Sequence, residues 1–252
     1  MFDQYDFGYS WIWTYGHLIP CFIFGLLALA AWRLEWAKWK LYGSFAGAIW
    51  SLAGLSVILF VIGIDTPMTL PDIDFLASGH GKVLDLGAGS GRTTLMVLEA
   101  RPEAEVTALD LFSECCGIVG NTPDRLMQNA RIAGVADRVT PLPGDMREIP
   151  APDEEFDAVV TAYAIDHLGR EGVDASLAEI HRVLKPGGEL LLEVLNRDNW
   201  IRLAYPIFPH GYYGRSTPAE VWGGAIERAG FEIVRVGTQP GTLYIWARKQ
   251  AQ

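Results

Sequence analysis

The stretch VLDLGAGSG, Val83–Gly91, decides the fold because it joins an apolar strand to a loop of alternating glycines. Glycines at such a turn let the backbone approach a ligand closely. A dinucleotide-binding loop needs GxGxxG, but Arg92 stands where the third glycine would be, so NAD is disfavoured. The spacing present is D-x-G-x-G-x-G with Asp85 in front. It predicts a strand that ends at the binding loop of another water-soluble cofactor.

Around this loop, strand patterns and helix patterns alternate to the end of the chain. Each strand candidate is an apolar run bounded by turn residues. The strand candidates are Lys82–Leu86, Glu105–Leu109, Val139–Leu142, Phe156–Ala162, Glu189–Val194, Phe231–Val236 and Leu243–Ala247. The helix candidates are Thr93–Ala100, Pro123–Ala133 capped by Thr122, Ala175–Leu184, and Pro218–Ala229 capped by Thr217. The alternation predicts an α/β fold with a doubly wound, mostly parallel sheet.

Three motifs together point to a family. VLDLGAGSGRTT resembles the first motif of class I S-adenosylmethionine (SAM) dependent methyltransferases, and GDM, Gly144–Met146, resembles their adenine motif. EIHRVLKPGGELLLEV, Glu179–Val194, resembles the fifth-strand segment of small-molecule members related to quinone-biosynthesis enzymes. The resemblance covers about Gly79–Arg248. It implies a seven-stranded Rossmann-like methyltransferase sheet and a SAM-dependent methyltransferase activity.

The resemblance also implies how SAM is bound. Asp85 would receive the cofactor's ammonium group, and Asp110 would accept both ribose hydroxyls. Asp145 would bind the adenine amino group while Met146 covers the ring. The expected cofactor-binding residues are Asp85, Gly87, Ala88, Gly89, Gly91, Asp110, Leu111, Gly144, Asp145, Met146 and Ala162.

The fourth strand candidate ends in TAYAIDHLG, which lacks the Asn/Asp-Pro-Pro-aromatic motif of enzymes that methylate adenine or glutamine amino groups. His167 is the candidate general base, because histidine titrates in the useful range. Asp166 and Tyr163 are expected to orient it or to line the pocket. The alternative is that His167 packs beside the cofactor. The aromatic segment Asn199–Ser216 is expected to be a lid over an apolar acceptor with an anionic group, or an ordinary connection.

The chain begins with two apolar stretches. Phe7–Trp32 and Leu41–Ile64 contain no Asp, Glu, Lys or Arg, and each approaches the roughly 20 apolar residues that cross a membrane. Tryptophans and basic residues flank them, as at membrane interfaces. We expect a membrane-anchoring helical hairpin over residues 1–64, a linker over 65–78 and a methyltransferase domain over 79–252. Gly43 and Gly47 have GxxxG spacing, so their helix face could join two copies of the chain.

The charge distribution limits the kinds of binding partner that we expect. Acidic and basic residues cancel up to Ile64, so the formal net charge of -10 lies in the methyltransferase region. An acidic domain is repelled by nucleic acid and by anionic lipid, so hydrophobic insertion must hold it to the membrane. The 3 cysteines, Cys21, Cys115 and Cys116, predict neither a disulfide framework nor a metal site.

These observations predict a membrane-anchored methyltransferase for a lipophilic small molecule. The alternatives are methylation of a membrane protein side chain, or a membrane scaffold with a vestigial cofactor fold. We expect the methyltransferase domain on the cytoplasmic side, where SAM is made. Since Pro20 leaves a short apolar core before Arg33, we expect the loop Arg33–Lys40 to dip into one leaflet rather than to reach the far side.

Overall fold

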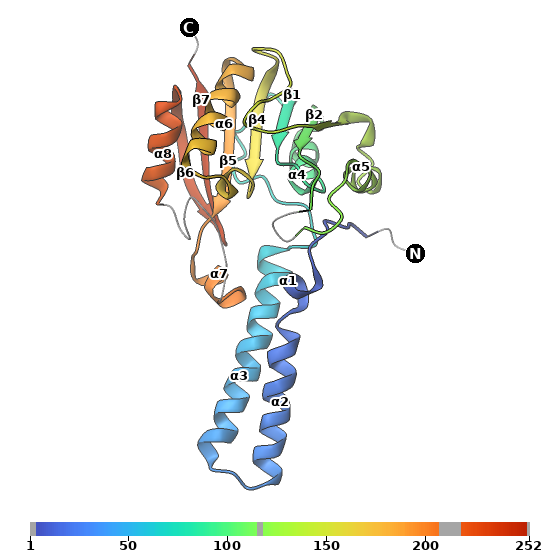
Figure 1. The fold of residues 1–252 in the computed structure, drawn as a ribbon, viewed down its shortest axis with the longest axis vertical. Coiled ribbons are helices and arrows are strands. Elements are labelled where there is room, and N and C mark those ends of the chain that lie inside the picture. Colours follow the sequence, from blue (N-terminus) through green and yellow to red (C-terminus); the bar gives the residue numbers. More distant parts are fainter. Residues whose placement is uncertain (1–3, 115–117, 207–217, 251–252) are drawn as a thin grey trace.

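The computed structural model describes residues 4–114, 118–206 and 218–250. It has two parts: a head built on a sheet, and a helical hairpin that projects from the head (Figure 1). The hairpin leaves the head on the side where the glycine loop lies. The hairpin and the glycine loop therefore lie at the same end of the sheet.

The sheet of the head has 7 strands in the order β3-β2-β1-β4-β5-β7-β6. β1 pairs in parallel with β2 on one side and with β4 on the other, so the chain reverses direction across the sheet at β1. Such a reversal opens a crevice at the carboxyl ends of the strands. β7 is antiparallel to both of its neighbours. The strands are β1 (His80–Leu86), β2 (Glu103–Asp110), β3 (Val139–Pro143), β4 (Phe156–Ala162), β5 (Leu184–Leu195), β6 (Phe231–Gln239) and β7 (Thr242–Lys249).

The sheet confirms the seven predicted strands and the Rossmann-like class. Helices cover both of its faces, and each face has its own apolar core. The helices of the head are α4 (Arg92–Ala100), α5 (Pro123–Ile132), α6 (Arg170–Val183), α7 (Asn199–Ala204) and α8 (Ala219–Arg228), with short 3-10 turns η2 (Ala136–Arg138) and η3 (Ile165–His167).

The predicted helices differ from the observed ones mainly at α6 and α7. α6 begins at Arg170 instead of Ala175, because burial of Val173 in the core extends a helix that Gly172 would otherwise weaken. α7 occupies part of the expected lid, whose remainder, with the cap Thr217, lies outside the described residues. Thr122 caps α5 as predicted, since its side chain accepts from the backbone N–H of Arg125.

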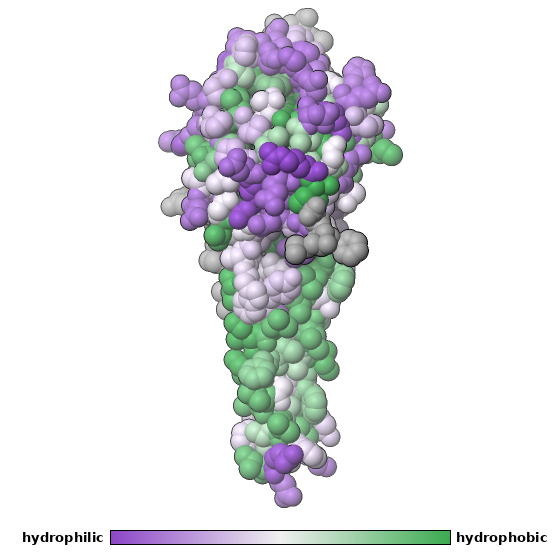
Figure 2. Space-filling model, turned by 90° about the vertical axis from the view of Figure 1, so that its right-hand side faces the viewer, coloured by the Kyte–Doolittle hydropathy of each residue, from purple (hydrophilic) through white to green (hydrophobic). Residues whose placement is uncertain are grey.

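The hairpin is built from four helical segments. They are α1 (Trp11–Tyr15), α2 (Leu18–Arg33), α3 (Lys38–Ser56) and the π-helix η1 (Val57–Ile62) that continues α3. Figure 2 shows the hairpin surface as hydrophobic along its length, with hydrophilic residues at its tip. Lys38–Ile62, 25 residues long, is apolar enough to cross a membrane. At 1.5 Å per residue it measures about 37 Å.

Small residues let the two arms of the hairpin pack closely. A Cβ on Gly47 would come within 2.7 Å of the Phe24 ring, and one on Gly54 within 2.4 Å of the His17 ring. A Cβ on Gly43 would meet no described atom within 4 Å. Gly47 is therefore engaged within the hairpin, and pairing of two chains through this face stays a prediction.

The expected linker is packed on the head although it forms no regular element. Phe75 is fully buried in the core beneath α4. Buried Asp72 forms an ion pair with Arg235 of β6 at 2.8 Å, and the Arg101 side chain donates to the Phe75 carbonyl at 2.9 Å. These contacts fix residues 65–78, so the hairpin is not joined to the head by a loose tether.

The first described residues also pack on the head rather than on the hairpin. Phe7 is buried in the same core as Phe75. The Asn129 side chain accepts from the N–H of Asp6 at 2.9 Å and donates to its carbonyl at 2.8 Å. The N–H of Val119 donates to the Gly8 carbonyl at 2.8 Å. Residues 6–8, which the expected division assigns to the hairpin, therefore contact the head, and the division itself stays a prediction.

Hairpin packing can be tested with two glycine variants. Gly47→Leu should destabilise the full chain by about 1 to 3 kcal/mol, because overpacking against Phe24 forces the arms apart. Gly43→Leu is the matched control and should leave stability nearly unchanged. Thermal unfolding in detergent measures both. Equal losses would contradict the packing, and a loss confined to Gly43→Leu would place Gly43 at a contact between chains.

Candidate active site

The glycine loop turns tightly against the end of β2. The N–H groups of Gly87 and Ala88 both donate to the Leu109 carbonyl, at 2.8 and 3.1 Å. Gly87 has a φ of 76°, and a Cβ there would lie 2.2 Å from the Ala164 Cβ. Only glycine fits this position without displacing its neighbour. The loop thereby leaves an open cradle for a ligand above the backbone.

Asp110 holds the loop in place. Its Oδ2 accepts from the N–H of Gly89 at 2.9 Å, while Oδ1 accepts from the N–H of Phe112 at 2.7 Å and from the Asn121 side chain at 2.9 Å. Leu111 follows with an exposed side chain. The carboxylate is thus fixed at the carboxyl end of β2, where the ribose was expected to bind.

Asp85 is fully buried beneath the loop. Its Oδ2 accepts from the Thr94 hydroxyl at 2.6 Å, while Oδ1 has no hydrogen-bond partner among the described residues. Burial raises the pKa of Asp85 to about 7, although the Thr94 hydrogen bond opposes the shift. A nearby cation would restore its ionised form, as the ammonium group of SAM would.

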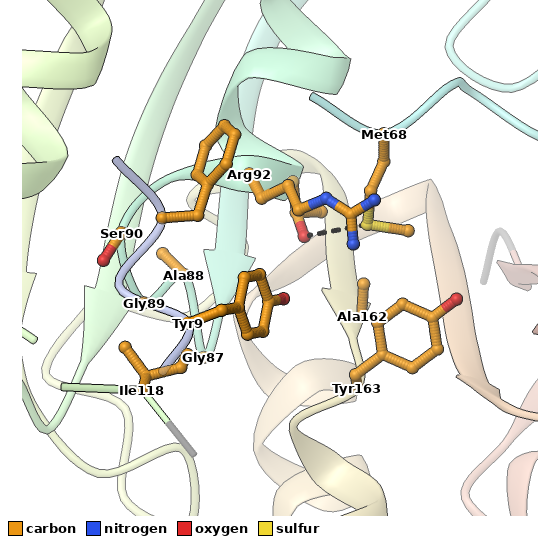
Figure 3. A pocket seen from close by; sticks show the side chains of 12 residues that line it. Tyr9, Met68, Gly87, Ala88, Gly89, Ser90, Arg92, Ile118, Ala162 and Tyr163 are labelled. Atoms are coloured by element: carbon orange, nitrogen blue, oxygen red, sulfur yellow. Dashed lines mark hydrogen bonds between the residues drawn. The ribbon is translucent and has the colours of Figure 1, made fainter. Parts of the chain in front are cut away.

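A pocket opens above the loop (Figure 3). Tyr9, Arg92 and Tyr163 surround the space over Ala162 (Figure 3). The pocket is lined both by residues that the sequence predicted and by residues that it did not indicate. The lining residues are Phe7, Tyr9, Met68, Gly87, Ala88, Gly89, Ser90, Arg92, Thr93, Ile118, Ala162 and Tyr163. The pocket therefore brings together Gly87, Ala88, Gly89 and Ala162 as expected, and adds a wall from residues near the hairpin.

The adenine motif lies beside the same loop. Gly144 donates its N–H to the Asp110 carbonyl at 3.0 Å, and the Met146 methyl group would lie 3.3 Å from a Cβ on Gly87. Asp145 accepts from the Arg147 side chain at 2.5 to 3.1 Å, and these bonds lower its pKa. The Asp145 carboxylate is therefore engaged by Arg147, and its contact with adenine stays a prediction.

The expected catalytic residues separate in the structure. Tyr163 lines the pocket, and its hydroxyl is hydrogen-bonded to the Thr242 hydroxyl. Burial of that hydroxyl strongly raises the pKa of Tyr163, so it stays neutral. Asp166 accepts from the N–H of Leu195 at 3.4 Å, and His167 ends η3. Within the described chain neither residue lies on the pocket wall, so the role of His167 as base stays a prediction.

Arg92 joins the pocket to the hairpin. Its Nε donates to the Thr66 carbonyl at 2.7 Å, and its Nη2 donates to the carbonyls of Ile62 and Gly63, both at 2.9 Å. Ile62 and Gly63 end the helical arm of α3 and η1. In the sequence, Arg92 was notable only because it stands where a dinucleotide-binding loop would have its third glycine. Its role was missed because its hydrogen-bond partners are backbone atoms roughly thirty residues away.

Another residue was missed although the sequence carries a signal. Glu193 interrupts the apolar run LLLEVL of β5 and is buried, with no hydrogen-bond partner for either carboxyl oxygen among the described residues. An acid inside a buried strand is costly unless it is neutral or meets a cation. Burial raises the pKa of Glu193 to about 8.

The ribose assignment can be tested at Asp110. Asp110→Ala should weaken SAM binding about tenfold or more, because charge-assisted hydrogen bonds contribute about 1.5 to 3 kcal/mol and the Gly89 N–H also loses its acceptor. Calorimetric titration with SAM measures the affinity. Asp124→Ala, at the exposed start of α5, is the control. Unchanged affinity in Asp110→Ala would refute the assignment.

Comparisons with known proteins agree with this site. Residues 83–188 match the family model described as Methyltransferase domain. The ubiquinone/menaquinone biosynthesis C-methyltransferase UbiE of Allorhizobium ampelinum is 30% identical over 148 residues, 54% of this chain and 54% of that protein. UbiE of Methylobacterium nodulans is 36% identical over 111 residues, 44% of this chain and 40% of that protein. The chain thus spans about half the length of the curated relatives it matches.

Solved structures share the fold. A SAM-dependent methyltransferase from Aquifex aeolicus has a TM-score of 0.52 at 20% identity, over 67% of this chain and 81% of that chain. An O-methyltransferase family protein from Burkholderia thailandensis has a TM-score of 0.55 at 13% identity, over 92% of this chain and 72% of that chain.

At such identities the structural likeness shows the fold alone, and the chemistry follows from the family match and the site. The open glycine cradle and the unsatisfied oxygen of Asp85 fit a cofactor with an ammonium group. Residues 83–188 of the head thus match a methyltransferase domain within a Rossmann-like methyltransferase fold, and the match and the fold indicate S-adenosylmethionine as the cofactor.

Proposed function

We propose that this chain is a membrane-anchored methyltransferase that moves a methyl group from SAM to a lipophilic small-molecule acceptor. The observation that carries the proposal is the position of the pocket at the base of the hairpin. Tyr9 lies just before α1, and Met68 lies shortly after η1. The chain segments that enter and leave the hairpin are thus walls of the cofactor pocket, which would open near the membrane surface.

The surface of the hairpin supports anchoring. Its side chains include exposed Phe22, Leu26, Ile49 and Phe60, and less than a quarter of the apolar window in Lys38–Ile62 is buried. A core helix of a soluble protein would be mostly covered. At the tip, Lys40 lies 5.2 Å from the Trp36 ring centroid, in the aromatic and cationic setting of a membrane interface.

The pocket walls and the relatives support the acceptor class. Phe7, Tyr9, Met68 and Ile118 give the pocket an apolar and aromatic wall, which suits a hydrophobic ring or chain. The matched relatives bear the name of quinone-biosynthesis C-methyltransferases. We extend the acceptor class, a lipophilic compound of the quinone-precursor type, to this chain as a proposal. An anionic group on the acceptor stays an expectation from the lid sequence.

The proposed mechanism assigns most of the work to positioning. When bound, SAM would supply a methyl group on a sulfonium to an in-line nucleophile, with S-adenosylhomocysteine as the leaving group. The glycine loop would hold the cofactor, and Tyr163 would limit the space in which an acceptor can lie. Holding both reactants at near-attack distance supplies much of the rate enhancement. A hydroxyl or acidic carbon also needs a base, and we propose His167 for that step.

Two alternatives remain open to test. Methylation of a membrane protein side chain would use the same pocket position. A non-catalytic scaffold is less favoured, because Gly87, Asp85 and Asp110 keep the geometry that cofactor binding needs.

Labelled cofactor separates these possibilities. Membranes that contain the full chain are incubated with methyl-labelled SAM, and the label should enter the organic-solvent extract. Gly87→Val is the control, because its side chain would collide with Ala164 and block the cradle. Label in the protein fraction would favour the side-chain alternative. Label in neither fraction, with SAM still bound, would favour the scaffold.

We also propose that the head is cytosolic and that the tip of the hairpin stays within one leaflet. Among the described helices only Lys38–Ile62 is long and apolar enough to cross a membrane, and the first arm α2, Leu18–Arg33, is shorter (Figure 1). At 1.5 Å per residue α2 covers about 24 Å, against a hydrocarbon core of about 30 Å. His17, just before α2, is hydrogen-bonded to the Ala204 carbonyl of α7 at 2.6 Å, so the residues before Leu18 are held at the head.

A cysteine at Glu35, in the tip loop, tests the crossing. In intact cells, Glu35→Cys should not react with an impermeant thiol reagent, because a tip held within one leaflet is not exposed outside. The unchanged chain, with its native cysteines, is the control. Reaction of Glu35→Cys in intact cells would show a true crossing and contradict the shallow hairpin.

A further inference from the structure

Glu193 is a buried acid that the mechanism above does not use. Only 1% of its surface is exposed, and neither carboxyl oxygen has a hydrogen-bond partner in the described part of the chain. Burying an ionisable group without a partner is costly. A site that keeps such a group beside a cofactor pocket is suited to a cationic ligand group.

The sheet places Glu193 at the cofactor site. It pairs with Ala162 of β4, whose side chain lines the pocket. The N–H of Tyr163, the next pocket residue, donates to the Glu193 carbonyl at 3.0 Å. Side chains alternate along strands, so Glu193 lies on the same face as Leu191, in the core that contains α4. Among the described residues Glu193 itself does not line the pocket, so a ligand group would reach it past the small Ala162.

No described group around Glu193 forms an ion pair or a hydrogen bond with its carboxyl. Arg92 of α4 lies near enough to lower its pKa, but donates from Nε and Nη2 to the carbonyls of Ile62, Gly63 and Thr66. Asp85 of β1 is a second acid and raises the Glu193 pKa further. Tyr163 contributes a neutral hydroxyl, and Tyr244 of β7, its pair across the sheet, has its hydroxyl beside Gly237.

We propose that Glu193 is a second cofactor-binding acid, which together with Asp85 receives the ammonium group of SAM. Asp85 on β1 and Glu193 on β5 flank β4, whose last residue Ala162 lines the pocket. Burial favours the protonated form of both acids, and binding of the ammonium group favours the loss of their protons. The proposal rests on the SAM cofactor and is independent of the acceptor.

The test compares Glu193→Gln with Glu189→Gln by calorimetric titration of the full chain in detergent at pH 8.5. Glu189 lies on the same strand and the same face, away from the pocket, and is the matched control. Glu193→Gln should weaken both SAM and S-adenosylhomocysteine about tenfold or more, since both carry the ammonium. Glu189→Gln should bind both within about twofold of the unchanged chain.

The dependence on pH separates binding from structure. A protonated Glu193 resembles glutamine, so the affinity ratio between the unchanged chain and Glu193→Gln should fall from about tenfold at pH 8.5 to within about threefold at pH 6. The cofactor's own amino group titrates similarly in both proteins, so it cancels in the ratio. Thermal unfolding without cofactor should be unchanged, or raised, in Glu193→Gln.

Three outcomes would overturn the proposal. Unchanged affinity for both ligands would remove Glu193 from the site. Weakening of SAM alone would assign Glu193 to the sulfonium instead of the ammonium. A lower unfolding temperature with unchanged affinity would show a structural role. None of these outcomes bears on whether the labelled methyl group reaches a lipid-soluble acceptor, so this proposal and the proposed function can fail separately.

Discussion

Arg92 sets the relation between the two parts of this molecule. Its guanidinium holds three carbonyls at the end of the hairpin helix, while its backbone begins α4 directly after the glycine loop. The last carbonyls of a helix lack partners and carry partial negative charge. A planar guanidinium with five donors suits several such acceptors at once. This side chain therefore joins the hairpin to the glycine loop, together with the contacts of His17 and Trp13 with the segment around α7.

The same arginine shapes the electrostatics of the pocket. It is the positive charge that favours ionisation of Glu193 and Asp65, and burial works against it in both cases. Since its hydrogen bonds go to backbone carbonyls, it does not form an ion pair with any acid in the described chain. The head is acidic, and its cofactor carries positive groups. Burial thus favours the neutral forms of Asp85 and Glu193 until a cationic group of the ligand binds.

Much of the fold was predictable because its signals are local. Strand bounds followed from apolar runs between turn residues, and the glycine loop and Asp110 followed from spacing along the chain. Thr122 identified the start of α5 by its own side chain. The hairpin was visible as uncharged sequence. These features depend on residues within a few positions of one another.

The missed features depend on contacts between distant segments. Phe7, Tyr9 and Met68 line the pocket through packing that no periodicity encodes. α7 lies where a lid or an ordinary connection was expected. Arg92 donates hydrogen bonds to backbone carbonyls, which every residue has, so the sequence does not indicate its partners. Glu193 could have been noticed as an acid within an apolar strand, but its significance required knowing that Ala162 beside it opens to the pocket.

The contact between Asp6 and Asn129 joins residues 123 positions apart. During synthesis, Asp6 and the hairpin leave the ribosome long before Asn129 is made. The apolar hairpin is thus made before the cofactor cradle exists. Completing the head requires the later strands to pack against this early segment. A chain shortened to begin after the hairpin would therefore lack Phe7 and Tyr9, and its pocket would be open on that side.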